Sequence, residues 1–236
     1  MPIHSRWQVP IPVTSLQSFL FTSETAPLPD KVAFYDAERP DTHFLTPSTF
    51  RLWSLRLAAG LRKAGLKPGD RVLLFSGNSL FSPVVLIGIL MAGGIFTGAN
   101  PGFVVRELAY QLKDSDAKFL ICADGSLELG VEAAGIAGMG KEKVFRFDDE
   151  LFEGCGSGRL GVRNWSVLVE SEDVGRTFRW HVPDPKEETA CLNYSSGTTG
   201  VPKGVMITHF AYVANTAQYC HLPTLHADYE ERTENS

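Results

Sequence analysis

The hydrophobic pattern of the chain alternates between short apolar runs and longer stretches of helical period. Short runs that are typical of buried strands occur at Arg71–Phe75, Phe119–Cys122, Val144–Phe147 and Thr189–Tyr194. Between these runs, apolar residues recur three and four positions apart, which indicates amphipathic helices. Strands that alternate with helices over short connections predict an α/β fold with a mostly parallel sheet flanked by helices.

The helix that begins at Thr46 has the clearest signals at both ends. Thr46 supplies a capping hydroxyl and Pro47 suits the first helical position. Gly65, followed by a Lys-Pro-Gly-Asp turn, predicts its end. Further helices are expected at Ser79–Met91, at Val105–Leu112 and from about Ser126 to Ala137.

The remaining segments suggest how the chain is organised. Residues 1–45 show little periodicity and are expected to form an arm with a short strand at Val32–Tyr35. Residues 46–188 are interpreted as one α/β subdomain, with 148–188 irregular. Residues 189–222 are interpreted as a strand and the start of a second, incomplete subdomain, and 223–236 as a polar tail.

One apolar stretch, Val72–Val105, contains no charged residue. A membrane-spanning helix needs about 20 consecutive apolar residues. Serine, asparagine, proline and paired glycines interrupt this stretch, so we interpret it as a buried strand, a buried helix and a tight turn. The start of the chain shows no secretory signal.

Composition narrows the functional classes. The 236 residues are 44% hydrophobic and 21% charged, as in ordinary globular proteins. The formal charge of −5 and the pI near 5.7 argue against nucleic-acid binding. The four cysteines form no C-x-x-C pair, which favours reduced, mostly buried thiols in an intracellular protein. The five-residue spacing of His221 and His226 does not favour a metal site.

The candidate chemistry lies where the strand Thr189–Tyr194 runs into Ser195-Ser-Gly-Thr-Thr-Gly200. Glycines allow backbone N–H groups to close on an anion, hydroxyls add donors, and Lys203 adds a compact positive charge. This set of groups suits a polyphosphate. A plain Ser/Thr/Gly surface loop is the simpler alternative. A Walker-type phosphate loop is excluded, because position 202 is Pro and Lys203 is followed by Gly204.

The segment from Asn193 to His209 resembles the signature loop of the adenylate-forming superfamily, which includes acyl-CoA synthetases, 4-coumarate-type CoA ligases and luciferases. Ala92–Phe103 resembles a second segment of that family. Phe19-Leu-Phe, Pro27–Lys31 and Gly69–Val72 also fit the 4-coumarate-like branch. The resemblance therefore covers nearly the whole chain.

The resemblance implies a reaction in which a carboxylic acid and ATP form an acyl-adenylate and pyrophosphate, after which coenzyme A takes the acyl group. It implies that Mg²⁺ arrives with the nucleotide. His209 stands at a family-like position near the start of the acyl pocket, although a helix-start histidine without a chemical role fits equally well. The residues that the resemblance assigns to the β- and γ-phosphates are Ser195, Ser196, Gly197, Thr198, Thr199, Gly200 and Lys203.

The sequence stops about 30 residues after Val205, whereas members of this family extend much further. The adenine-binding segments, the hinge and the catalytic C-terminal lysine of the family have no counterpart here, so the catalytic residue is unknown. We expect an N-terminal fragment of the ligase lineage that is inactive alone and whose exposed face self-associates. The alternative is a catalytically silent nucleotide- or partner-binding module. Cytoplasmic location is expected, or peroxisomal location if a full-length form carries such a signal.

Overall fold

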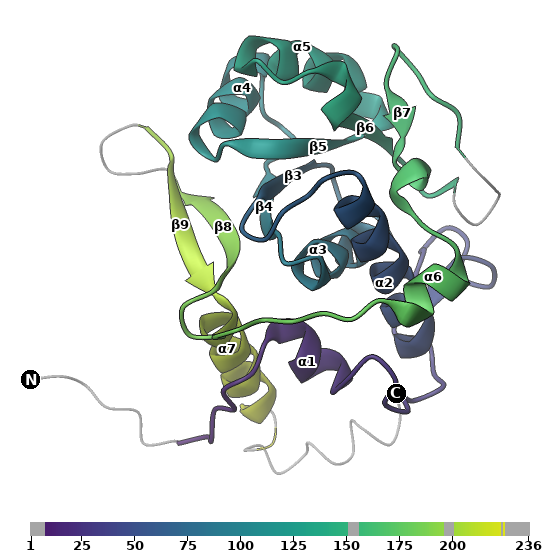
Figure 1. Cartoon of the computed structure of the whole chain (residues 1–236), viewed down its shortest axis with the longest axis vertical. Helices are drawn as coiled ribbons and strands as arrows, with labels where there is room; N and C mark the ends of the chain where they lie inside the picture. Colours follow the sequence, from purple (N-terminus) through teal and green to yellow (C-terminus); the bar gives the residue numbers. More distant parts are fainter. Residues whose placement is uncertain (1–7, 151–155, 196–200, 223, 225–236) are drawn as a thin grey trace, which may run out of the picture.

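A computed structural model describes residues 8–150, 156–195, 201–222 and 224 (Figure 1). In this part of the chain, the main sheet has seven strands in the order β7-β6-β5-β3-β4-β8-β9. All neighbours are parallel except β8 and β9, which are antiparallel. The strands are β3 (Arg71–Phe75), β4 (Ile95–Ala99), β5 (Ala117–Ala123), β6 (Val144–Phe147), β7 (Arg163–Asn164), β8 (Thr189–Ser195) and β9 (Lys203–Thr208). The predicted α/β fold with a mostly parallel sheet is confirmed.

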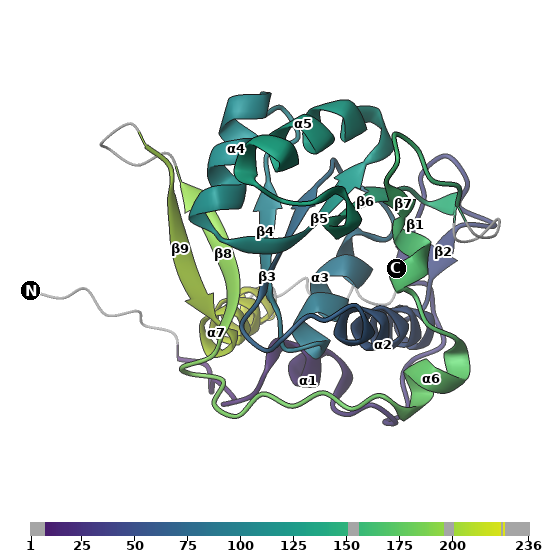
Figure 2. The same ribbon diagram turned by 45° about the horizontal axis from the view of Figure 1, so that its top comes forward.

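Helices cover both faces of the sheet (Figures 1 and 2). On one face lie α1 (Leu16–Phe21), α2 (Pro47–Lys63), α3 (Ser82–Met91) and α7 (His209–His221), with α6 (Glu172–Thr177) packed on α2. On the other face lie α4 (Val105–Asp114) and α5 (Leu127–Ala137). A separate two-stranded hairpin contains β1 (Phe34–Tyr35) and β2 (Phe44–Leu45).

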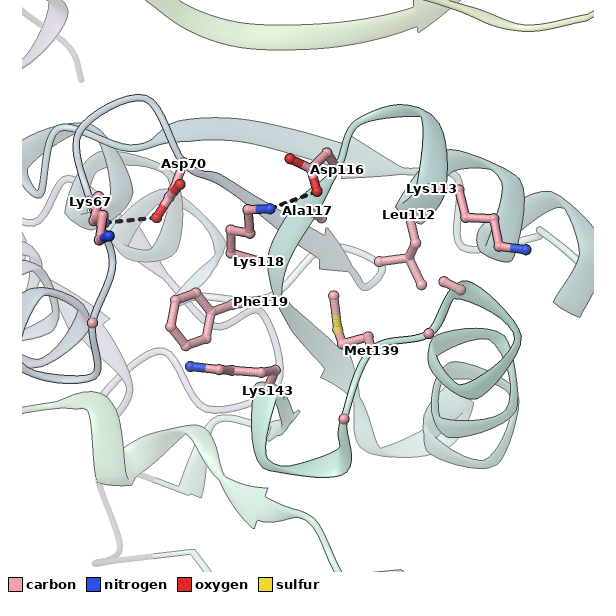
Figure 3. Close-up of a pocket in the computed structure, with 14 residues that line it drawn as sticks. Lys67, Asp70, Leu112, Lys113, Asp116, Ala117, Lys118, Phe119, Met139 and Lys143 are labelled. Carbon is pink, nitrogen blue, oxygen red and sulfur yellow. Dashed lines mark hydrogen bonds and ion pairs between the residues drawn. The ribbon is translucent and has the colours of Figure 1, made fainter.

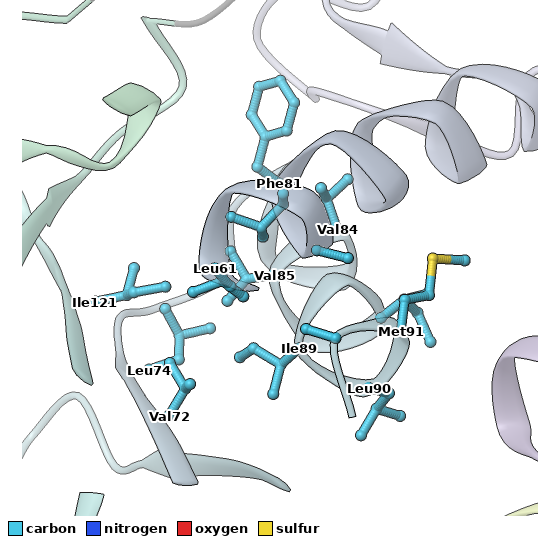
Figure 4. Packing of buried hydrophobic residues seen from close by; sticks show 14 of the residues in the cluster. Leu61, Val72, Leu74, Phe81, Val84, Val85, Ile89, Leu90, Met91 and Ile121 are labelled. Atoms are coloured by element: carbon cyan, nitrogen blue, oxygen red, sulfur yellow. The ribbon is translucent and has the colours of Figure 1, made fainter. Parts of the chain in front are cut away.

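The alternation of side chains along β3 builds the two cores. Val72 and Leu74 belong to the cluster under α2 and α3, whereas Leu73 and Phe75 belong to the cluster under α4 and α5. This two-sided burial is why the strand is a continuous apolar run. Figure 4 shows the first cluster, in which Val72, Leu74 and Ile121 of the sheet lie against Val85 and Ile89 of α3.

Helix α2 begins as the sequence predicts. The Thr46 and Thr49 side chains form a reciprocal capping box, and Pro47 is the first helical residue. The helix ends at Lys63, two residues before Gly65, whose φ is +97°. Gly60 allows a close approach, because a Cβ there would lie 1.8 Å from the carbonyl oxygen of Leu168.

Several elements differ from the sequence predictions. Ile95–Ala99, interpreted as part of a tight turn, is the strand β4 between β3 and β8. Gly98 lowers the strand propensity of this segment, and pairing on both sides overrides it. The predicted arm contains α1, and the segment predicted to be irregular contains β7 and α6. The subdomain boundary expected at residue 189 stays a prediction. The strands β8 and β9, which follow that position, belong to the same sheet as β3.

The charge-free stretch folds as β3, α3 and β4. Among the described residues, no helix is long and apolar enough to cross a membrane. Cys122 and Cys191 are buried free thiols, as expected, whereas Cys220 is exposed. Burial raises the pKa of Cys191 to about 11, which makes this thiol unreactive at neutral pH.

Candidate functional site

The hairpin of β8 and β9 extends beyond its neighbour in the sheet. Parallel pairing of β8 with β4 covers Phe96 opposite Cys191 and Thr97 opposite Leu192. Beyond Leu192, the residues of β8 pair with β9 alone. This end of the hairpin lies at the carboxyl edge of the parallel strands, where open α/β sheets usually bind ligands.

The ends of the predicted phosphate loop face each other across this hairpin. Ser195 ends β8, Lys203 begins β9, and the two residues are direct partners in the ladder. Their Cα atoms are therefore about 5 Å apart. Both residues are exposed, and Lys203 forms no ion pair with the described residues.

The middle of the predicted loop lies outside the described residues: Ser196, Gly197, Thr198, Thr199 and Gly200. The structure therefore brings together the first and last members of the predicted set, Ser195 and Lys203. A hydroxyl and an ammonium group without an ion-pair partner among the described residues stand at the two ends of a connection whose sequence is rich in Gly, Ser and Thr. These donors fit a phosphate group.

Helix α4 contacts both ends of the connection between β8 and β9, a feature that no local sequence pattern predicts. The Tyr194 hydroxyl donates a 2.6 Å hydrogen bond to Oδ2 of Asp114. The Tyr110 hydroxyl donates a 2.9 Å hydrogen bond to the carbonyl oxygen of Pro202. Burial and the neighbouring Asp114 carboxylate raise the pKa of Tyr194, so its hydroxyl stays protonated and donates. The sequence offered little signal for this contact, because the predicted helix ends at Leu112, whereas α4 continues to Asp114 and so places it four residues after Tyr110 on the same helix.

A small pocket of about 310 Å³ lies between α4 and the two stems. Gly204 faces Tyr194 across the ladder, and a Cβ at Gly204 would lie 3.1 Å from Cζ of that tyrosine ring. The absence of a side chain at Gly204 thus makes room for the ring. The pocket is lined by Phe103, Arg106, Glu107, Tyr110, Gln111, Tyr194, Val201 and Pro202.

His209 lies at the other end of β9, as the first residue of α7. The six residues of β9 separate it from Ser195 by roughly 20 Å. It is 3% exposed, and its Nδ1 accepts a 3.4 Å hydrogen bond from the backbone N–H of Leu16. Burial lowers its pKa to about 4, so the ring is neutral at pH 7. It lines a pocket of about 190 Å³ together with Arg62, Met91 and Glu188; its part in an acyl site stays a prediction.

A larger pocket, of about 580 Å³, lies at the opposite, amino edge of β3 and β5 (Figure 3). Lys67, Lys113, Lys118 and Lys143 line it. Lys118 pairs with Asp116 at 2.6 Å, and the Lys143 ammonium lies 4.7 Å from the centre of the Phe119 ring. The carboxyl ends of α4 and α5 also face this edge, and their dipoles favour cations. The lysines therefore complement helix ends and do not indicate a nucleotide site.

The chain is similar to known proteins over nearly its whole length. A family model described as AMP-binding enzyme matches residues 21–233. The chain is 33% identical over 210 residues to the acyl-CoA ligase azaF of Aspergillus niger, covering 87% of this chain and 38% of the relative. It is 33% identical over 203 residues to a 4-coumarate–CoA ligase of Pinus taeda, covering 86% of this chain and 35% of the relative.

Solved structures confirm the fold. The chain superposes on a long-chain-fatty-acid–CoA ligase of Archaeoglobus fulgidus with a TM-score of 0.71 at 23% identity, over 91% of this chain and 41% of that one. At this identity the likeness shows the fold alone. The chain thus spans somewhat more than a third of the length of the curated relatives that it matches.

Proposed function

The chain belongs to the AMP-binding enzyme family, and on that premise we propose that it holds the nucleotide phosphates in an enzyme that joins a carboxylic acid to coenzyme A. Its lineage is that of the acid–CoA ligases, because acyl-CoA and 4-coumarate–CoA ligases are among its relatives. The observation that carries the proposal is the ladder pair of Ser195 and Lys203 at the carboxyl edge of the sheet.

In the proposed reaction, a carboxylate oxygen of the acid bonds to the α-phosphorus of ATP. The bond from that phosphorus to the bridging oxygen breaks, and pyrophosphate leaves. The Ser195 hydroxyl and the Lys203 ammonium donate to the departing phosphates, and the positive charge of Lys203 offsets the negative charge that builds up on them. Mg²⁺ accompanies the phosphates, as is usual for this ion.

In the second proposed step, the thiol of coenzyme A gives its proton to solvent and its sulfur bonds to the acyl carbon, while the bond from that carbon to the AMP oxygen breaks and AMP leaves. No described residue is assigned to coenzyme A, and the assignment of His209 to the acyl site rests on the family resemblance alone. An aryl acid, a phenylpropanoid or a medium-chain fatty acid all remain open as the substrate. The proposed contributions of Ser196, Gly197, Thr198, Thr199 and Gly200 follow from sequence alone, and a cytoplasmic or peroxisomal location stays a prediction.

Calorimetric titration of the purified chain with MgATP tests the phosphate site. We expect Lys203→Ala to weaken binding about tenfold or more, because hydrogen bonds to charged groups contribute about 1.5 to 3 kcal/mol. Lys31→Ala is the matched control, because it removes a lysine from an exposed position outside the β8–β9 hairpin. Equal MgATP affinities for the wild type and the Lys203→Ala variant would refute the proposed role of Lys203.

The same donors would also serve a module that binds nucleotide without turnover. Exchange of labelled pyrophosphate into ATP, measured with a panel of carboxylic acids, separates the two functions. Exchange that depends on an added acid supports the ligase function in this chain. MgATP binding without any exchange supports the nucleotide-binding module.

A further inference from the structure

Among the residues that the structure describes, the outer half of the β8–β9 hairpin has no neighbour in the sheet. The last three residues of β8, from Asn193 to Ser195, pair with Lys203, Gly204 and Val205, and pairing of β8 with β4 stops at Leu192. An isolated two-stranded hairpin is marginally stable in water. The stems of the 196–202 connection therefore need another source of support.

Helix α4 supplies this support to each stem separately. Asp114 accepts the Tyr194 hydroxyl on the β8 side, and the Tyr110 hydroxyl donates to Pro202 just before β9. Tyr110 and Asp114 are four residues apart on α4, so their side chains lie on the same helix face. The Tyr110 hydroxyl also lies 3.4 Å from Oδ1 of Asp114, so the two anchors adjoin each other.

The helix that carries these anchors is itself fixed to the sheet. Leu108, Ala109 and Leu112 are buried in the core beneath α4. The buried Gln111 side chain donates 3.0 Å hydrogen bonds to Oγ1 of Thr97 and to the carbonyl oxygen of Gly98, both in β4. Oγ1 of Thr97 in turn donates to the carbonyl oxygen of Leu192. Helix α4 is thus a rigid support relative to the base of the hairpin.

We propose that Tyr110 and Asp114 are positioning residues, which clamp the two stems of the connection so that Ser195 and Lys203 face a common phosphate group. This inference rests on the proposed function of the hairpin. It assigns neither residue to contact with the nucleotide. A clamp of this kind increases affinity because the donors lose less conformational freedom when the ligand binds.

Hydrogen–deuterium exchange measures the clamp without any ligand. Each anchor is a partly exposed hydrogen bond, and such a bond typically contributes about 1 kcal/mol. We therefore expect Asp114→Ala or Tyr110→Phe to speed amide exchange at residues 201–206 by about five- to tenfold. Asp114→Asn keeps an acceptor oxygen in the same place, and we expect it to restore most of the protection. Exchange in β3 should not change in any of these variants.

Two surface variants serve as matched controls. Tyr219→Phe removes a hydroxyl from a side chain that is 72% exposed on α7, and Asp173→Asn removes a charge from an exposed position on α6. Both should leave exchange at residues 201–206 unchanged. The proposed clamp is contradicted if amides 201–206 exchange at the same rate in the α4 variants as in the wild type. It is also wrong if they speed exchange in β3 equally, because that result indicates general destabilisation.

Titration with MgATP then separates the clamp from the proposed function. We expect the affinity of Asp114→Ala to fall by the same factor as the loss of protection, with partial recovery in Asp114→Asn. Faster exchange with unchanged affinity would overturn the positioning role. If the wild-type chain does not bind MgATP, the proposed function fails for this chain and the positioning role fails with it, while the exchange data still decide whether α4 holds the hairpin.

Discussion

Acidification should remove a specific part of the stability of this protein through His209. The ring is 3% exposed at the start of α7, and its unprotonated Nδ1 accepts the N–H of Leu16. Protonation would place a charge in a buried site. The protonated Nδ1 would be a donor that faces the Leu16 N–H, which is also a donor. The charge would also lie at the amino end of α7, where the helix dipole disfavours a cation. Burial accordingly lowers the pKa of His209 from 6.5 to about 4.

The direction and the size of the effect follow from this shift. Because the folded pKa lies below the unfolded one, the unfolded chain binds the proton first as pH falls. The stabilisation is therefore fully present above pH 6.5 and is lost as the pH falls towards 4. Between pH 7 and pH 5, the free energy of unfolding should decrease by about 2 kcal/mol through this residue.

Urea denaturation, followed by tryptophan fluorescence, provides the assay at both pH values. Other acidic and basic groups also titrate in this range, so the informative quantity is the difference between the wild type and His209→Asn. The Asn Oδ1 atom occupies nearly the position of Nδ1 and accepts the Leu16 N–H, but it does not take up a proton. The exposed His181→Asn is the matched control and should follow the wild type. Equal losses of stability in the wild type and His209→Asn would show that protonation of His209 is not the cause of the loss.

Two further predictions concern the rest of the sheet. Arg146, whose side chain is 9% exposed, pairs with Asp124, Asp148 and Glu150. Of these carboxylates, only Asp148 is mostly shielded from solvent, with a side chain that is 12% exposed. Arg146→Met should lower the free energy of unfolding in urea by about 3 kcal/mol, because the Asp148 carboxylate loses its cation. The exposed Arg176→Met should cost no more than about 0.5 kcal/mol, and similar losses in the two variants would contradict the role of Arg146. Among the described strands, β9 is at the edge of the sheet, and its Val205 and Met206 are 51% and 72% exposed. An exposed, apolar edge strand is a template for pairing with another chain. We therefore expect sedimentation to show self-association that Met206→Lys reduces, and a wild-type chain that stays monomeric would exclude this surface as an interface between copies.

Local sequence signals predicted the elements that depend on local physics. Thr46 and Pro47 define the start of α2 because capping and proline geometry act within one turn of a helix. Arg71–Phe75 was predicted with its observed bounds, since a strand buried on both faces has to be a continuous apolar run. The order of Ser, Thr and Gly after Tyr194, with Lys203 beyond it, is sufficient by itself to indicate the lineage.

Features that depend on residues far apart in the chain follow from packing in the folded protein and are not visible in local sequence signals. Ile95–Ala99 is a strand because β3 and β8 pair on either side of it. Gly98 weakens the local strand signal of this segment, so the sequence pattern alone did not predict the strand. The burial of His209 depends on Leu16, 193 residues away, and the support of the hairpin depends on Asp114, 80 residues before Tyr194. The sequence alone indicates which donors are candidates for contact with a phosphate. The packing of α4 against the sheet decided how their stems are held, because that contact exists only after the chain has folded.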